Sequence, residues 1–305
     1  MSYRLVTYVS PDGAPRAGVV SGGRVHDAEG LTGRARHATM LGLLEDWGEA
    51  LQLLASRAGQ VAGGQPLAET KLLAPILYPG AIYCAGANYT DHMQEMARVM
   101  SLPPEPDPHE RGIKPWHFLK TSRGSIVGPG EPVKMPSYSR MVDWEIELAA
   151  VIGRECKNVP VARALDYVAG YTIANDLSAR DFLTRPEVGD ASPFKWDWMS
   201  QKCFDGACPI GPWIVPANEV TNPQALALKL WVGDDLMQDS HTSRMIFSLA
   251  EQIEHLSSRI TLFPGDLVLT GTPAGVGMAR KRFLKAGDTM RVWIERIGEF
   301  CTPVI

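Results

Sequence analysis

The sequence predicts an α+β fold made mostly of β-strands, with a small α/β domain ahead of it. From Leu72 to the C-terminus, β-branched stretches are interrupted by glycine and proline, a pattern typical of short strands. These stretches do not alternate regularly with helical segments, which argues against a doubly wound parallel sheet. The 305 residues are 45% hydrophobic and 21% charged, a globular composition that excludes a disordered or collagen-like chain.

Residues 1–70 form the predicted small domain. Alternating stretches at Tyr3–Val9 and Ala17–Val25 predict short strands, because successive side chains of a strand face opposite ways. Met40–Arg57 has the composition and spacing of a helix. The glycines and the proline of Ala62–Pro66 are typical of a joint between two domains.

The larger predicted domain comprises residues 71–305. Its expected strands are Ala81–Ala85, Val142–Ile152, Val168–Ala174, Leu228–Val232 and Leu267–Thr270. One amphipathic helix fits Ser243–Leu256, because its apolar residues fall on one stripe. The proline-rich stretch from Met100 to Gly112 can form neither a helix nor a paired strand. We expect a loop there that closes over the functional site as a lid.

Charge and cysteine usage exclude several classes of protein. The chain has 30 lysines and arginines against 34 aspartates and glutamates, a net charge of −4 that offers no general attraction to nucleic acid or to an anionic membrane. Its start lacks an apolar leader, and its apolar runs are too short to cross a bilayer. The 5 scattered cysteines argue against a disulfide framework or a zinc knuckle. We therefore expect a soluble cytoplasmic protein.

The strongest chemical signal is the stretch Asp143–Leu148. As a strand, it sends its apolar residues to one face and its acidic residues to the other. Glu145 and Glu147 would then lie roughly 6.6 Å apart at Cα on one face. Buried neighbouring carboxylates repel each other, and a hard divalent cation removes that cost. The spacing alone is equally consistent with an ordinary polar strand face that is exposed to solvent.

Asp176 is the candidate for a third acidic ligand, because it follows the apolar run Val168–Ala174. A carboxylate at the end of a buried strand points into the crevice that the strands share. By itself, an aspartate at such a place is also typical of a helix N-cap or a turn. Three acidic ligands suit Mg²⁺ or Mn²⁺ better than zinc, which prefers histidine and cysteine.

A helix start is predicted at Asp91, which Gln94 follows at the spacing of a capping box. His92 would take the first helical position, with Glu95 on the same face. The positive end of the helix dipole disfavours imidazolium, so His92 could accept a proton while Glu95 orients its ring. Taken alone, a surface histidine beside a surface glutamate is the simpler interpretation, so this hypothesis depends on the metal site.

Two lysines and one glycine-rich loop could hold an anionic substrate. Lys202 precedes a bend rich in glycine and proline, and Lys120 follows an aromatic stretch, although most lysines are simply surface residues. Gly271–Gly277 closes a strand and offers backbone amides, as anion-binding nests do. It is not a Walker loop, because it lacks the glycine–lysine pair followed by serine or threonine. It is not a dinucleotide fingerprint either, because Arg280 stands where the last glycine should be.

Taken together, these segments resemble the fumarylacetoacetate hydrolase family. The matching strings occur in the family's order within residues 72–305: Gly86–Glu95, Asp143–Leu148, Asn175–Asp181, Lys202–Gly206 and Gly265–Gly277. The resemblance implies a mixed β-sandwich roll behind a small N-terminal domain, as in many bacterial members, and a homodimer. It also implies Mg²⁺ or Mn²⁺ bound by Glu145, Glu147 and Asp176.

The same resemblance implies that His92 and Glu95 form a catalytic dyad and that Lys202 approaches the metal site. The candidates for substrate binding are Tyr89, Lys120, Gln238 and Thr272. The sequence departs from the family pattern in a longer stretch over residues 182–201 and at Leu183, where many members have glutamine. Both departures are expected to border the distal end of the substrate.

The function implied is hydrolysis of a C–C bond in a β-diketo acid of the acylpyruvate type, in the catabolism of aromatic or related compounds. In this hypothesis the metal stabilises the departing enolate, while His92 and Glu95 activate a water molecule. The same enolate would serve an isomerase of 2-hydroxy-diene-dioates or an oxaloacetate-type decarboxylase. An inactive metal-binding protein on this fold is the alternative from a different class.

Overall fold

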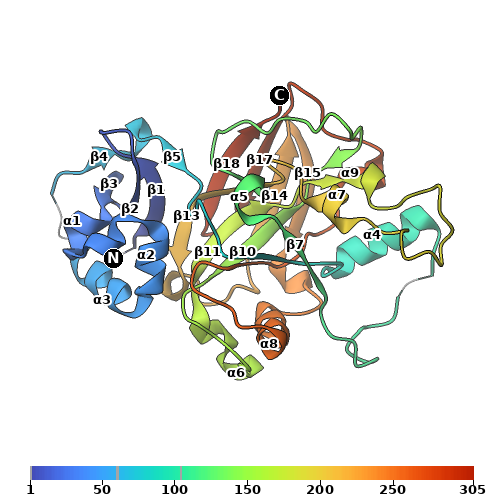
Figure 1. The fold of residues 1–305 in the computed structure, drawn as a ribbon, viewed down its shortest axis with the longest axis horizontal. Coiled ribbons are helices and arrows are strands. Elements are labelled where there is room, and N and C mark those ends of the chain that lie inside the picture. The colour runs from blue at the N-terminus through green and yellow to red at the C-terminus, as the bar shows by residue number, and fades with distance from the viewer. Residues whose placement is uncertain (1, 60–61, 104) are drawn as a thin grey trace.

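One mixed sheet of 12 strands joins the N-terminal part of the chain to the centre of the molecule (Figure 1). The computed structural model describes residues 2–59, 62–103 and 105–305. The strand order is β4-β3-β2-β1-β13-β11-β10-β16-β6-β7, with β5 paired to β1 and β8 paired to β13. The strands are β1 (Arg4–Val9), β2 (Pro15–Ser21), β3 (Arg24–Asp27), β4 (Gln65–Pro66), β5 (Leu72–Leu73), β6 (Ile82–Ala85), β7 (His117–Lys120), β8 (Ile126–Val127), β10 (Ile146–Ile152), β11 (Val168–Asn175), β13 (Cys208–Pro216) and β16 (Leu267–Leu269).

A second, four-stranded antiparallel sheet packs against β10 and β11. Its order is β15-β14-β17-β18, and its strands are β14 (Ala227–Val232), β15 (Asp235–His241), β17 (Thr289–Ile294) and β18 (Gly298–Pro303). The short strands β9 (Val142–Asp143) and β12 (Ser178–Ala179) pair with each other. Leu148 and Ile173 of the large sheet share a core with Leu230 and Val292 of the small one, so the two sheets form a sandwich.

Helices lie around the sheets and between strands. They are α1 (Ala28–Thr32), α2 (Met40–Glu45), α3 (Trp47–Arg57), α4 (Thr90–Met100), α5 (Ser122–Ser125), α6 (Val161–Ala164), α7 (Trp198–Lys202), α8 (Leu249–Arg259) and α9 (Gly277–Arg280). Short 3-10 helices occupy Ala35–Ala38, Leu67–Glu69, Leu165–Tyr167, Arg180–Phe182, Ala217–Glu219 and Thr242–Arg244. Across the described ranges, no helix has both the length and the apolar character needed to cross a membrane.

Strand β10 is buried on both faces, which places its acidic neighbours at the centre of the molecule. Leu148 and Ala150 pack into the core between the two sheets, whereas Ala149 and Val151 pack into a second core that includes Leu43 of the N-terminal helices. Such a strand reads as a continuous apolar run rather than as an alternating one. Any charge on β10 therefore lies in a low-dielectric environment.

The predicted α+β fold, made mostly of strands, is confirmed. The strands expected around β6, β11, β14 and β16 have the observed bounds to within one residue at each end. The strand expected over Val142–Ile152 is instead interrupted between β9 and β10. The interruption arises because the amide of Glu145 donates a hydrogen bond to Asn175 Oδ1, at 2.9 Å, rather than to a neighbouring backbone carbonyl.

Both predicted helices have different bounds in the structure. The one expected over Met40–Arg57 is divided at Asp46, whose carboxylate lies 3.1 Å from Nε2 of the buried His37. The one expected from Ser243 begins instead at Leu249, because Ser248 and Glu251 form a capping box there. The Ser248 amide donates to Glu251 Oε2 at 2.8 Å, and Ser248 Oγ accepts from the Glu251 amide at 3.3 Å.

The proline-rich stretch after α4 is a loop, as expected, although its Pro104 lies outside the described residues. His109 connects this loop to α8, since its Nε2 lies 2.9 Å from Glu251 Oε1 and its ring centroid lies 4.7 Å from that of Phe247. The loop therefore contacts the beginning of α8. Its role as a lid stays a prediction.

Candidate active site

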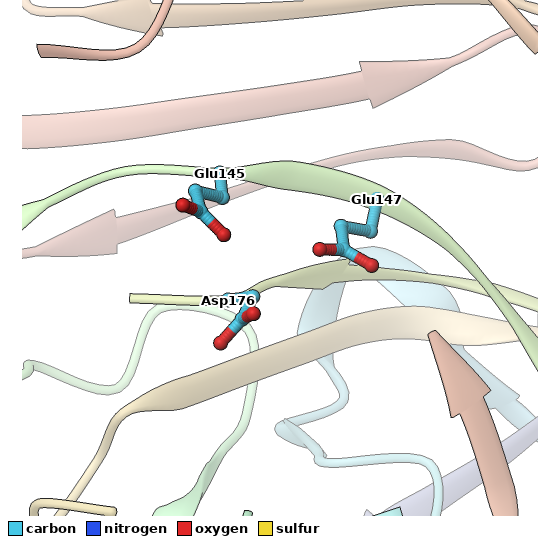
Figure 2. Close-up of side chains that lie close together, drawn as sticks. All are labelled: Glu145, Glu147 and Asp176. Carbon is cyan, nitrogen blue, oxygen red and sulfur yellow. The ribbon is translucent and has the colours of Figure 1, made fainter. Parts of the chain in front are cut away.

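Three acidic side chains meet where β10 and β11 lie side by side (Figure 2). Glu145 directly precedes β10, Glu147 lies within it, and Asp176 directly follows β11. The antiparallel pairing of these strands brings the beginning of one to the end of the other. All three side chains are buried, and one oxygen of each lies within 4.8 Å of an oxygen of the others. The structure thus brings together the three predicted metal ligands.

Two buried lysines supply positive charge to this cluster. Lys202 Nζ donates to Glu145 Oε2 at 2.8 Å and to Asp176 Oδ2 at 2.7 Å. Lys120 Nζ lies 2.7 Å from Asp176 Oδ1. Burial would raise the pKa of Glu145, but Lys202 and Arg180 hold that pKa below its usual range. Burial likewise opposes the charge on Lys202, yet Asp176 and Glu145 raise its pKa.

Glu147 lacks such a partner. Within the described residues its carboxylate pairs with no lysine or arginine, and its Oε2 accepts one hydrogen bond, from the Gly271 amide at 2.6 Å. Burial first, and then Asp176 and Glu145, raise the pKa of Glu147 well above its usual value. The cluster is therefore short of positive charge, and its carboxylate oxygens are the donors that a hard divalent cation prefers. These residues fit the predicted metal.

A cavity of about 170 Å³ lies beside the carboxylates. Its polar lining consists of His92, Glu145, Glu147, Arg180, Gln201, Lys202 and Thr272. Its apolar lining consists of Ala85, Gly86, Ala87, Trp116, Phe118, Leu183 and Trp198. The site therefore combines a few polar groups with an apolar wall, as is usual for small-molecule sites.

His92 lines this cavity with an imidazole that is neutral at pH 7, because burial lowers the pKa of His92 to about 4. Its Nδ1 is buried and has no hydrogen-bond partner in the described part of the chain. His92 is the third residue of α4 rather than the first, because the extended Tyr89, bridged to Met245, caps the helix. Burial is the main cause of the lowered pKa of His92.

The model of the fumarylacetoacetate hydrolase C-terminal family matches residues 81–305. The chain belongs to this family. It is 37% identical over 310 residues to a mitochondrial oxaloacetate tautomerase of Xenopus laevis, covering 100% of this chain and 91% of the relative. Its fold is that of the family's solved structures, and as a member it is an enzyme of the group that includes hydrolases, isomerases and tautomerases.

Two crystal structures are similar over nearly the whole chain. A maleylpyruvate hydrolase from Sphingobium sp. SYK-6, in complex with manganese(II) and pyruvate, has a TM-score of 0.75 and 29% identity, with 99% of this chain and 98% of that chain covered. A 2-hydroxyhepta-2,4-diene-1,7-dioate isomerase from Mycobacterium marinum has a TM-score of 0.70 and 33% identity, with 100% and 98% covered. The family resemblance predicted from the sequence is therefore confirmed.

Glu95 lies on the same helix as His92, and its carboxylate contacts the glycine-rich loop. No hydrogen bond joins the two side chains in the described residues, and Glu95 Oε2 instead accepts one from the Gly275 amide at 2.8 Å. The expected dyad is therefore not formed in this structure, and the catalytic role of Glu95 stays a prediction. Burial raises the pKa of Glu95 although this amide opposes the rise.

The glycine-rich loop differs from the open anion nest that the sequence suggested. Three of its amides donate to carboxylates of the chain itself: Gly271 donates to Glu147, Gly275 to Glu95 and Gly277 to Asp143. The Gly277 amide lies 2.6 Å from Asp143 Oδ1. These three amides therefore hold acidic side chains of the protein itself.

Of the four candidates for substrate binding, Thr272 lines the described cavity and the other three do not. Lys120 is buried and donates to the carbonyls of Leu177 and Lys202. Gln238 lies behind Thr272 and donates to Thr272 Oγ1 at 2.9 Å. Tyr89 packs into the core between the sheets. The roles of these residues in binding stay predictions.

Sequence reasoning missed Arg180 and the aromatic wall of the cavity. Arg180 Nε lies 2.9 Å from Asp143 Oδ2, and its guanidinium also contacts Glu145. Arg180 therefore bridges these two carboxylates. The string that contains Asp176 also contains Arg180, so the resemblance could have identified it. The aromatic residues Trp116 and Trp198 come from segments far apart in the chain, and no local pattern brings them together.

Proposed function

We propose that the protein is a divalent-metal-dependent enzyme that moves a proton at C3 of a 2-oxo acid and so interconverts its keto and enol forms. One observation carries this proposal: His92, a neutral imidazole whose Nδ1 has no hydrogen-bond partner among the described residues, lines the same cavity as Glu145 and Glu147. The similarity to an oxaloacetate tautomerase supports it, because that relative's name describes such a reaction.

Glu145, Glu147 and Asp176 would hold the cation. When bound, it would supply positive charge to the substrate's oxygens and so favour loss of the C3 proton. Mg²⁺ and Mn²⁺ both suit these oxygen donors, and the similar maleylpyruvate hydrolase contains manganese. Neutralisation of the otherwise unpaired Glu147 would contribute to binding.

The protein's own residues would perform the proton transfer. His92 takes the proton from C3 on a ring nitrogen and returns it to the 2-oxo oxygen, which leaves the enol and a neutral imidazole. Lys202, held beside Glu145 and Asp176, adds positive charge near the oxygen that becomes negative. The apolar wall of the cavity excludes bulk water, which strengthens these interactions.

A second candidate is hydrolysis of the C3–C4 bond in a β-diketo acid of the acylpyruvate type. The similarity to a maleylpyruvate hydrolase that holds pyruvate favours it. In this reaction His92 would take a proton from water, the hydroxide would attack the distal carbonyl, and the enolate of the 2-oxo acid would leave. Glu95 lies on the same helix as His92 and would need to reach it to complete the expected dyad.

The decisive experiment measures both reactions on the full chain with Mg²⁺, with Mn²⁺ and with EDTA. Decay of enol absorbance, with oxaloacetate and phenylpyruvate, reports tautomerisation, and pyruvate release from a panel of acylpyruvates reports hydrolysis. We expect metal-dependent enol decay that falls at least about 100-fold in His92→Ala, since general acid–base groups contribute that much or more. His241→Ala, whose side chain lies outside the cavity lining, serves as the matched control.

Pyruvate release without enol decay would replace the proposed reaction with the second candidate. Absence of both reactions with either metal would reject the enzyme hypothesis for these substrates and favour a metal-binding protein without this activity. Equal rates in His92→Ala and the wild type would show that another group moves the proton.

A further inference from the structure

One wall of the cavity is built from three aromatic side chains. Trp116 directly precedes β7, Phe118 lies within it, and Trp198 begins α7. The ring of Trp198 stacks on Phe118 with centroids 5.3 Å apart and meets Trp116 edge-on at 5.1 Å. Leu183 extends the same lining. The wall is therefore a connected aromatic surface, a shape that favours contact with another planar group.

The cations of the cavity are already paired at its acidic end. Arg180 faces Asp143 and Glu145, while Lys202 faces Glu145 and Asp176. Among the described lining residues, none is a lysine or arginine free of a carboxylate partner. A substrate with a second carboxylate at its distal end would therefore lose the hydration of that charge without gaining an ion pair, which is costly.

Gln201 contributes a neutral amide to this lining. It is only 1% exposed, and its Oε1 has no hydrogen-bond partner in the described residues. A buried amide oxygen that lacks a partner costs free energy unless a ligand donates a hydrogen bond to it. Its neutrality fits an uncharged polar group on the ligand.

Gly86 sets the position of Trp116. A Cβ at Gly86 would lie 2.0 to 2.4 Å from three atoms of the Trp116 ring, far inside contact distance, so the ring lies directly against the glycine backbone. Trp116 is 43% exposed and can move aside when it is displaced. Substitution of Gly86 is therefore a way to shift the aromatic wall while leaving the acidic cluster unchanged.

We propose that the wall formed by Trp116, Phe118 and Trp198 selects 2-oxo acids whose distal group is planar and uncharged, above all an aryl group, over those that end in a second carboxylate. The proposal rests on the proposed function, because it concerns the substrate of the same site. It separates this chain from relatives whose names specify oxaloacetate or a dioate.

The test compares phenylpyruvate with oxaloacetate, which differ in the distal group. We expect kcat/KM for metal-dependent enol decay to be roughly 3- to 10-fold higher for phenylpyruvate, the range that one aromatic contact provides. Trp198→Leu and Gly86→Ala should each lower kcat/KM for phenylpyruvate roughly 3- to 10-fold more than kcat/KM for oxaloacetate, so that the preference itself falls. Gly189→Ala is the matched glycine control, because nothing lies within 4 Å of its added Cβ.

Equal or better turnover of oxaloacetate by the wild type would overturn the proposed selectivity while leaving the proposed function intact. An unchanged preference in both wall variants would overturn the role of the wall. If neither substrate turns over, the proposed function fails. Calorimetric titration of each acid into the protein, in the presence of Mg²⁺, then tests the wall directly. Tighter binding of phenylpyruvate that weakens in Trp198→Leu would support the wall, and equal or tighter binding of oxaloacetate would reject it.

Discussion

The three acidic residues of the site differ in how their charge is compensated. Glu145 pairs with both Lys202 and Arg180, whereas in the described part of the chain Glu147 accepts only the amide of Gly271. A buried carboxylate with a single neutral donor destabilises the metal-free protein, because desolvation is not offset. The fold accepts this cost at Glu147, which is the residue that a cation would stabilise most.

Replacement of Glu147 by glutamine should therefore have opposite effects without and with metal. The Gln amide oxygen can still accept from Gly271, but the repulsion by Asp176 and Glu145 is removed. We expect Glu147→Gln to raise the free energy of unfolding in EDTA by about 1 kcal/mol. It should also abolish the rise in melting temperature that Mg²⁺ gives the wild type. Thermal unfolding, with the exposed Glu187→Gln as control, measures both, and an equal Mg²⁺ effect in wild type and Glu147→Gln would contradict a ligand role for Glu147.

At the scale of elements, the sequence predicts most strands more reliably than the ends of helices. The apolar runs of β11 and β16 determine those strands locally, because each is buried as a continuous stretch. Helix α4 begins before Asp91 because Tyr89 bridges to Met245, a partner far away in the sequence. The carboxylate cluster follows from spacing and family resemblance, whereas the aromatic wall depends on β7 meeting α7, which no local pattern encodes.

The contact between β7 and α8 gives the protein a pH-dependent stability. His117 of β7 stacks on His255 of α8, with ring centroids 6.2 Å apart. Burial, and then His255, lower the pKa of His117 to about 4 from its ordinary value of 6.5. The unfolded chain therefore binds a proton at higher pH than the folded one. The contribution of His117 to the free energy of unfolding is complete above pH 6.5 and is lost as the pH falls toward 4.

We expect the wild type to lose on the order of 3 kcal/mol of unfolding free energy at His117 between pH 6.5 and pH 4. His92 contributes with the same sign, because burial lowers its pKa to about 4 as well. In His117→Gln, the pH-dependent loss of unfolding free energy due to His117 should disappear, whereas the loss due to His92 should remain. Urea unfolding across this pH range measures the difference. An identical pH profile in the variant would show that His117 is not buried as a neutral side chain.

For the whole molecule, the main question is whether residues 1–70 are an independent unit. The boundary near residue 70 follows from a change in sequence pattern and stays a prediction. In the structure, β1 pairs with β13 through Leu5 and Ile214, and both side chains share one core with Ile82 and Ala149. Pairing between strands so distant in the chain is invisible to local sequence reasoning. The homodimer implied by the resemblance also stays a prediction, which light scattering would test.

The shared sheet predicts that the full chain unfolds in one cooperative transition. Leu5 is completely buried at the junction of β1 and β13, so Leu5→Ala should lower the free energy of the whole transition by about 2–5 kcal/mol. Leu41→Ala, at a leucine that is 36% exposed in the same N-terminal part, should cost less than about 1 kcal/mol. Urea unfolding followed by circular dichroism and by tryptophan fluorescence provides the measurement. Two transitions, with only the first shifted by Leu5→Ala, would instead establish residues 1–70 as a separate folding unit, because the strands of the remaining chain would then hold together without β1.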